Sequence, residues 1–390
     1  MDDDQKSKHV DNEKLEFLQV ETKFSPLEEL TLSQEKTLIK FLKRMGRSFS
    51  LPTFSDDELE RAIPVLLESL KYYYETSWEK VPELYFKRPE SLPLFCVSSP
   101  VHLSSGEVCD LSFRSEFSPV YPEYEARLKN EPRWRSVRAK YWRHAKGQSR
   151  GTIIAVHGWM MGSEKASALT LVPGYFYRMG LDVIIFELPF HGLRNPEQLL
   201  PTLMFPGIDP ACTNEGFAQA IFELRSIREW LRREDDKPVI GMGLSLGGHT
   251  VALWHTLDFL DAAICVAPLV SLPDIIWSQV EGGPMEKRLQ EVGISKEVLE
   301  NGFSVSSPLA YPFSGIKSAT MIVAAKNDVI VPAAHATMLW EHWGRPDIHW
   351  VDDGHIEQLL TPGTGERIHE FLSRLGFADP ELRVVSSDRQ

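Results

Sequence analysis

The sequence predicts an α/β protein with a mostly parallel, doubly wound sheet, on two observations. First, from residue 151 onward, short continuous apolar runs alternate with longer segments in which apolar residues recur every three or four positions. Continuous apolar runs are typical of parallel strands buried on both faces, and the longer spacing is typical of helices with one buried face. Second, two earlier runs alternate apolar and polar residues, which indicates antiparallel strands. Regular alternation of strand and helix produces a parallel sheet with helices on both faces.

Residues 1–91 are predicted to form a helical extension in front of the sheet. Ser55 and Glu58 have the spacing of a capping box, in which each side chain satisfies a free amide at a helix start. The residues that follow place apolar side chains on one helix face (Leu59, Ala62, Ile63, Leu66, Leu67 and Leu70). Aromatic residues are then concentrated between Tyr72 and Phe86. We expect them to form interface core, with a place over a substrate entrance as the alternative.

Residues 92–375 are predicted to form the main domain, and residues 376–390 a C-terminal tail. The antiparallel strands are expected at one edge of the sheet, at 108–113 and 137–142. The expected parallel strands are 152–156, 182–186, 238–242, 262–266, 319–324 and 348–351.

One segment, between residues 271 and 312, interrupts the alternation of strands and helices. It contains no apolar strand, only short helical stretches around 275–277, 285–292 and 296–299. An insertion after a parallel strand falls at the carboxyl edge of the sheet, where such proteins bind ligands. We therefore expect a helical cap over the site; an excursion that makes no substrate contact is the alternative.

Composition and charge exclude several classes of function. The 390 residues carry a net charge of -13, which argues against a nucleic-acid-binding surface because phosphate binding needs clustered cations. No run approaches 18 apolar residues, and the acidic N-terminus has no apolar stretch behind it, so neither a membrane span nor an export signal is expected. The four cysteines are scattered without the spacing of a metal site or a disulfide framework. We therefore expect a cytoplasmic protein without a metal.

A candidate nucleophile follows the strand at 238–242. Residues 243–248 read GLSLGG and lead into an apolar helical stretch. A serine that turns sharply from strand to helix needs small neighbours on both sides, and the three glycines meet this need. The helix start also offers backbone amides and the positive end of the helix dipole. The pattern therefore predicts that Ser245 is a nucleophile.

A serine hydroxyl is a weak nucleophile that needs a base, and the base is oriented by an acid. On a turn of this kind the chain order is serine, acid, histidine. Asp328 follows one predicted strand and His355 follows the next, so both fit the order and the sheet edge. Asp352 and Asp353 are too close in sequence to His355 to face its ring productively.

The remaining site residues are expected in loops at the same edge. One oxyanion donor is the amide of Leu246, which follows the nucleophile, and the second comes from the loop after the first parallel strand. Trp159 is the predicted second donor, with Met160 as the alternative. Met160, His191 and Trp277 are the predicted substrate-binding residues, because they place rings and apolar surface around the pocket.

Residues 150–375 resemble the α/β-hydrolase superfamily in the His-Gly loop at 157–158, the GxSxGG turn, the acid segment from Asp328 and the Gly-His pair ending at His355. The resemblance implies an α/β-hydrolase fold of the serine esterase or acyl-hydrolase type that needs no metal or organic cofactor. Residues 187–194 are similar to the segment D-x-x-G-H-G-x-S of many members, but begin with Glu187 and end with Leu193 and Arg194. These departures indicate a divergent branch, to which the helical segment of residues 1–91 adds a long N-terminal extension.

The predicted function is hydrolysis of a carboxylic ester through a Ser-His-Asp triad and an acyl-enzyme intermediate. The predicted partner is a small-molecule ester, and assembly into a homo-oligomer is left open. A serine peptidase, or a thioesterase or acyltransferase, would use the same triad. A non-catalytic binding protein on the same fold is the alternative from another class.

Overall fold

The computed structural model describes residues 56–159, 161, 164–195, 205–207, 209–355, 358–361 and 363–380. The predicted capping box at Ser55, most of the N-terminal 91 residues and the last part of the predicted tail lie outside this range. The strands are β1 (Cys96–Leu103), β2 (Gly106–Arg114), β3 (Ser136–His144), β4 (Thr152–Val156), β5 (Asp182–Phe186), β6 (Val239–Leu244), β7 (Ala262–Val266), β8 (Thr320–Ala325) and β9 (Asp347–Val351). The α-helices are α3 (Asp56–Thr76), α4 (Pro82–Tyr85), α5 (Pro122–Asn130), α6 (Glu164–Leu171), α7 (Pro173–Arg178), α8 (Pro210–Asp235), α9 (Leu246–Leu257), α10 (Leu272–Ser278), α11 (Pro284–Glu291), α12 (Lys296–Phe303), α13 (Ala333–His342) and α14 (Thr364–Arg374).

The nine strands form one sheet in the order β1-β2-β3-β5-β4-β6-β7-β8-β9. Strands β1, β2 and β3 pair antiparallel, β3 pairs antiparallel with β5, and all later pairs are parallel. The parallel strands β4 to β8 are buried along their whole length, as their continuous apolar sequences predict. Every strand expected from the sequence is confirmed.

The edge strand β1 was not predicted as a separate element. Its residues are exposed or half-buried throughout, so they show no alternation of buried and exposed positions. Pro100 lies inside it, and the pairing register shifts between Ser98 and Val101. A bulge and a proline are typical of an edge strand that is protected from further pairing.

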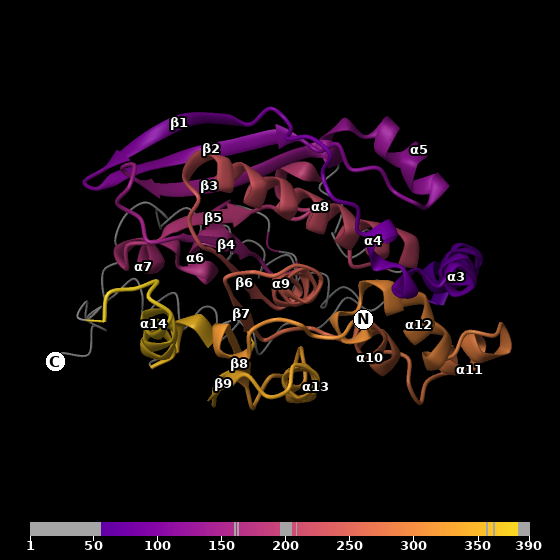
Figure 1. The fold of residues 1–390 in the computed structure, drawn as a ribbon. Helices are drawn as coiled ribbons and strands as arrows, with labels where there is room; N and C mark the ends of the chain where they lie inside the picture. The colour runs from indigo at the N-terminus through magenta and orange to yellow at the C-terminus, as the bar shows by residue number, and fades with distance from the viewer. Residues whose placement is uncertain are drawn as a thin grey trace, which may run out of the picture.

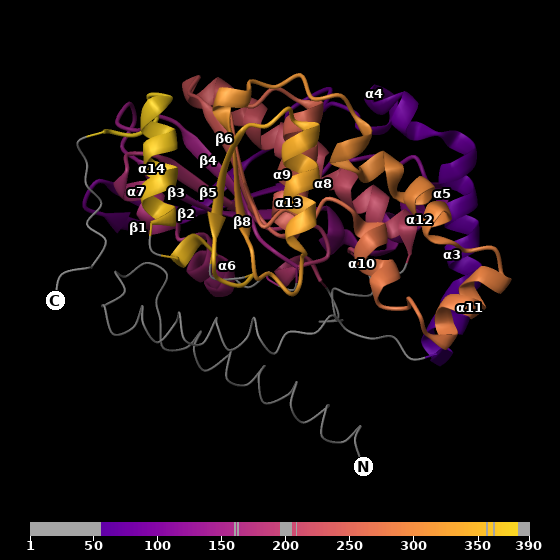
Figure 2. The ribbon, with the colours of Figure 1, turned by 90° about the horizontal axis from the view of Figure 1, so that it is seen from below.

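Helices cover both faces of the sheet, which confirms the doubly wound arrangement. Figures 1 and 2 show α6, α7 and α14 on one face and α8, α9 and α13 on the other. Each face has its own apolar core: Phe176 and Phe371 belong to the smaller one, and Phe217, Trp254 and Leu339 to the larger one. The sheet is thereby held rigid between two packed layers, with its carboxyl edge free to carry loops.

The cap and the N-terminal extension pack against each other. Helices α10, α11 and α12 occupy the predicted insertion, and α3 lies beside α12 and α8 (Figures 1 and 2). A β-carbon at Gly302 of α12 would overlap Leu70 Cδ2 of α3, so the two helices approach closely there. Ser69 Oγ donates to Asp209 Oδ1, 3.0 Å away, which ties α3 to the residue that caps α8. The buried apolar side chains of α3 therefore belong to the larger core.

Most of the aromatic residues between Tyr72 and Phe86 are confirmed as core, whereas Tyr74 is 66% exposed. Tyr73, Tyr85 and Phe86 are each at most 2% exposed and pack against the larger core. At the other end of the chain, Ala378 is buried in the smaller core and Phe377 packs against it, so these two residues of the predicted tail pack on the domain. In the part of the chain that the structure describes, none of the helices combines the length and the apolar character that a membrane crossing needs.

Candidate active site

Ser245 lies on a strained turn between β6 and α9. Its backbone angles are φ 58° and ψ −112°, a region that residues other than glycine rarely occupy. The turn is held from both sides: Ser245 N donates to Val266 O at 2.8 Å, and Ser245 O accepts from His249 N at 2.9 Å. These hydrogen bonds and the surrounding core hold the backbone in this conformation despite the strain.

The glycines around Ser245 are required by close backbone contacts. A β-carbon at Gly243 would overlap Gly247 O, and a β-carbon at Gly247 would overlap Val156 O at the end of β4. A β-carbon at Gly248 would lie 2.9 Å from Val266 O, closer than real carbon atoms come. The small residues in the motif therefore allow the turn to pack directly on the ends of β4 and β7.

Asp328 and His355 meet at the carboxyl ends of β8 and β9. His355 Nδ1 lies 2.6 Å from Asp328 Oδ2, and the two side chains are 6% and 2% exposed. The second carboxylate oxygen of Asp328 accepts from the amides of Ile330 at 2.9 Å and Val331 at 2.8 Å. With Nδ1 donating to the carboxylate, the Nε2 atom of His355 is left as the proton acceptor.

Ser245, Asp328 and His355 follow β6, β8 and β9, which lie in the same parallel part of the sheet and end at the same edge. Among the described residues, no hydrogen bond joins Ser245 Oγ to His355, and such bonds are often long before substrate binds. The competing carboxylates are engaged elsewhere: Asp352 pairs with Lys326 at 2.8 Å on the surface, and Asp353 accepts from Thr361.

The predicted oxyanion residues lie beside the nucleophile. Gly158, in the loop after β4, is so near Ser245 that a β-carbon on it would lie 3.6 Å from Ser245 Cβ. Trp159 follows directly and packs against the larger core. Leu246 is the first residue of α9, so its amide has no acceptor within the helix. Met160 lies outside the described residues.

His157 links the loop after β4 to the loop after β5. Its Nδ1 atom donates to Gly158 O at 2.8 Å, and its Nε2 atom accepts from Leu188 N at 3.1 Å. These two bonds need a neutral ring with its proton on Nδ1. Burial lowers the pKa of His157 to about 4, which agrees with a neutral ring.

The other predicted pocket residues are buried in this structure. His191 is 0% exposed, lies 5.0 Å from His157 ring to ring, and contacts Pro189 O through Nδ1 at 2.9 Å. Trp277 of α10 is 7% exposed and belongs to the larger core. Contact between either side chain and a substrate stays a prediction.

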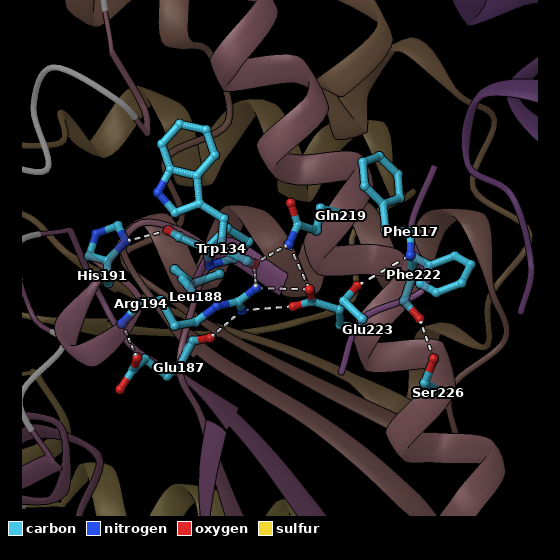
Figure 3. Close-up of polar contacts among 12 residues, drawn as sticks. Phe117, Trp134, Glu187, Leu188, His191, Arg194, Gln219, Phe222, Glu223 and Ser226 are labelled. Carbon is cyan, nitrogen blue, oxygen red and sulfur yellow. Dashed lines mark hydrogen bonds and ion pairs between the residues drawn. The ribbon is translucent and has the colours of Figure 1, made fainter. Parts of the chain in front are cut away.

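A buried ion pair and the hydrogen bonds around it connect the loop after β5 to α8 (Figure 3). Arg194, completely buried, contacts both carboxylate oxygens of Glu223 of α8, at 2.7 and 2.8 Å. Its Nη2 atom also donates to Trp134 O at 2.6 Å, and Gln219 Nε2 bonds both Trp134 O and Glu223. The sequence did not predict this network, although the departure from the family pattern at Arg194 marked the position.

His335 of α13 was also missed. Its Nδ1 atom accepts from the amides of Val270 and Ser271, each 3.3 Å away, and so holds the loop that leads from β7 into the cap. No sequence pattern connects a helical histidine with amides more than sixty residues away. Among the described residues, no group of three or more His, Cys, Asp or Glu side chains is arranged to hold a metal ion.

A hollow of about 420 Å³ lies at the opposite edge of the sheet, beside the first residues of β4 and β5. Its charged side chains are largely paired, for example Arg143 with Glu107 and His144 with Asp182. Because the hollow lies beside the first residues of the strands, it is separate from Ser245, which follows the carboxyl end of β6.

No protein-family model matches the chain. An uncharacterized protein of Mycobacterium tuberculosis, found in two strains, is 26% identical over 343 residues, covering 86% of this chain and 80% of the relative. Acetyl xylan esterase 1 from Thermoanaerobacterium sp. JW/SL YS485 is similar with a TM-score of 0.53 and 14% identity, over 79% of this chain and 94% of that one. Acetyl xylan esterase from Paenibacillus sp. R4 is similar with a TM-score of 0.52 and 14% identity, over 88% of this chain and 99% of that one. The chain has the α/β-hydrolase fold, which confirms the fold class predicted from the sequence and, at the level of the fold, the resemblance to that superfamily.

Proposed function

We propose that this α/β-hydrolase-fold protein is a serine esterase that cleaves a carboxylic ester through an acyl-enzyme intermediate. The observation that carries the proposal is the 2.6 Å contact between His355 Nδ1 and Asp328 Oδ2 at the sheet edge where Ser245 occupies its strained turn. A nucleophile, a base and an orienting acid are the three groups that acyl transfer from an ester needs.

In the proposed reaction, Ser245 Oγ attacks the ester carbonyl carbon while His355 Nε2 takes the hydroxyl proton. Asp328 stabilises the imidazolium that forms, through its contact with Nδ1. The carbonyl oxygen becomes an oxyanion that accepts hydrogen bonds from the amides of Leu246 and Trp159. The carbon–oxygen bond to the alcohol then breaks, and His355 returns the proton to the leaving alcohol. A water molecule, deprotonated by His355, attacks the acyl-enzyme in the same way and releases the acid.

The substrate is proposed to be a small ester with an apolar part, bound by Met160, His191 and Trp277. The two acetyl xylan esterases of the same fold give a concrete first choice, an acetyl ester, with a sugar as the alcohol for one arm of the test. A cytoplasmic location stays a prediction, and assembly into a homo-oligomer is left open.

The test is covalent trapping followed by a substrate panel. A fluorophosphonate probe is expected to label the protein at Ser245, and Ser245→Ala is expected to abolish both labelling and ester hydrolysis. Ser226→Ala is the matched control, because Ser226 is a buried serine of α8 whose hydroxyl donates to the helix carbonyl of Phe222. Absence of labelling at Ser245 in the folded protein would contradict the proposal and favour a binding protein.

The panel separates the alternatives that share the triad. It contains p-nitrophenyl esters of increasing acyl length, an acetylated xylo-oligosaccharide, an acyl thioester and aminoacyl anilides. Esters are expected to give the highest kcat/KM. Cleavage of the anilides alone would identify a peptidase, and a preference for the thioester or for transfer to an added alcohol would identify a thioesterase or an acyltransferase.

A further inference from the structure

The peptide group that joins Gly158 to Trp159 has a fixed orientation beside the nucleophile. Its carbonyl, Gly158 O, accepts from His157 Nδ1 at 2.8 Å and from Met161 N at 3.2 Å. Because a peptide group is planar and trans, the N–H of Trp159 points in the opposite direction from that carbonyl. The bonds to Gly158 O therefore determine where the Trp159 N–H points.

A second peptide group, between Glu187 and Leu188, is held in the same way. Its N–H belongs to Leu188 and donates to His157 Nε2 at 3.1 Å. Its carbonyl is Glu187 O, which accepts from Arg194 Nη1 at 3.0 Å. His157 thus stands between two peptide groups, accepting from one and donating to the carbonyl of the other.

The chain of hydrogen bonds begins at a cation. Arg194 is completely buried, and its charge is compensated by the two oxygens of Glu223, whose side chain is also 0% exposed. Figure 3 shows the guanidinium between Glu187, Trp134 and Glu223, with Leu188 close by. Every donor in the series points away from the guanidinium and toward the loop beside Ser245.

We propose that Arg194 is a positioning residue of the oxyanion hole, acting on the Trp159 amide through the Glu187–Leu188 peptide, His157 and the Gly158–Trp159 peptide. This rests on the proposed function, because it takes the Trp159 amide to be an oxyanion donor. Arg194 touches no substrate atom.

Two physical effects follow from this arrangement. The rigid series aims the Trp159 N–H before substrate arrives, and preorganised donors are the main source of oxyanion stabilisation. Hydrogen bonds that run in one direction also polarise one another, so the guanidinium makes the distant N–H a stronger donor. Both effects act on the negatively charged intermediate and leave substrate binding unchanged.

The test is the double variant Arg194→Met with Glu223→Gln, which removes both charges of the pair at similar volume. Because removal of a whole oxyanion donor costs about 10²- to 10³-fold in kcat, we expect a weakened donor to cost about 10- to 100-fold. KM for p-nitrophenyl acetate is expected to change by less than about twofold, since the ground state does not use this interaction.

A second readout reports on the oxyanion directly. In O-(4-nitrophenyl) thioacetate, sulfur replaces the carbonyl oxygen and accepts hydrogen bonds poorly. The ratio of kcat/KM for the oxygen ester to that for the thiono ester is therefore expected to fall in the double variant by about the same 10- to 100-fold factor as kcat. A loss of stability alone would lower both rates together and leave this ratio unchanged.

The matched control is Arg225→Met with Asp258→Asn. This pair is also buried and also includes one residue of α8, and Arg225 Nε lies 2.6 Å from Asp258 Oδ2. Unlike Arg194, however, Arg225 donates to a carbonyl of the N-terminal region, Lys87 O. We expect it to lower stability without changing the oxygen-to-sulfur ratio. A control that lowers the ratio as far as the Arg194 variant would overturn the inference.

If the double variant does not fold, His157→Asn replaces it. Asparagine keeps an N–H near the position of Nδ1 but loses the acceptor at Nε2. The variant therefore lacks the hydrogen bond from Leu188 N, which links the Glu187–Leu188 peptide to the loop after β4. The same fall in kcat and in the ratio is expected. A folded variant that Ser245 probes still label, with wild-type kcat and ratio, would refute the inference while leaving the esterase proposal intact; loss of Ser245 labelling in the wild type would refute the esterase proposal itself.

Discussion

Asp328→Asn is the substitution whose effect the structure defines most fully. Asp328 Oδ1 accepts two backbone amides, from Ile330 and Val331, and Oδ2 lies 2.6 Å from His355 Nδ1. In the variant, the amide oxygen is expected to remain with the two backbone donors, because turning the NH₂ group toward them would leave them unsatisfied at a cost of about 2–6 kcal/mol. The NH₂ group then faces His355.

An NH₂ group in that place donates to His355 Nδ1 and forces the ring proton onto Nε2. A ring protonated at Nε2 cannot take the proton of Ser245, so only the disfavoured amide orientation is active. A difference of about 4 kcal/mol, the middle of that range, corresponds to about a 10³-fold fall in kcat. The two side chains have the same shape, so the melting temperature is expected to stay close to that of the wild type.

The assay is steady-state hydrolysis of the best p-nitrophenyl ester, with circular dichroism to verify folding. Asp352→Asn is the control: Asp352 is an exposed partner of Lys326, and such surface pairs contribute little. A kcat for Asp328→Asn within about tenfold of the wild type would mean that Asp328 does not set the tautomer of His355.

Three further substitutions test the fold. Burial raises the pKa of Glu215 to about 8, so the native state holds a proton that an unfolded carboxyl with a pKa of 4.5 releases. The free energy of unfolding should therefore decline as the pH rises from about 4.5 through 8. Glu215→Gln should flatten this decline in denaturant titrations at a series of pH values. Arg194→Met alone leaves Glu223 buried without its partner and is expected to cost about 3–5 kcal/mol of stability, most of which Glu223→Gln should restore; equal stability of the single and double variants would contradict this. Gly302→Ala places a methyl group on Leu70 and is expected to cost about 1–3 kcal/mol, and a double-mutant cycle with Leu70→Ala that shows no coupling would refute the close approach of α3 and α12.

The predictable part of the molecule is the part whose chemistry forces a local pattern. Parallel strands buried on both faces must be continuously apolar, and the turn at Ser245 must have glycine where the backbone passes within contact distance of Val156 O. For the same reason, the order of Ser245, Asp328 and His355 along the chain could be read before the structure was known. Their proximity to one sheet edge follows from strand order, and their roles in catalysis stay a prediction.

The remaining features depend on pairings between distant residues. Arg194 and Glu223 are 29 residues apart, and no periodicity connects a loop arginine with a helical glutamate. His191 follows a strand, as the sequence shows, but its complete burial against the ring of His157 could not be read from the sequence. Strand β1 lacks the alternation that would announce it because both of its faces are accessible. In each case tertiary packing, which a single sequence does not display, decides the outcome.

The positive φ of Ser245 costs the folded protein stability, and this cost has a consequence for variants at that position. A side chain held in that region costs about 1–3 kcal/mol, and glycine at position 245 would relieve it. Selection for durability alone would therefore replace the serine, and the most heat-resistant form of this protein is expected to be an inactive one.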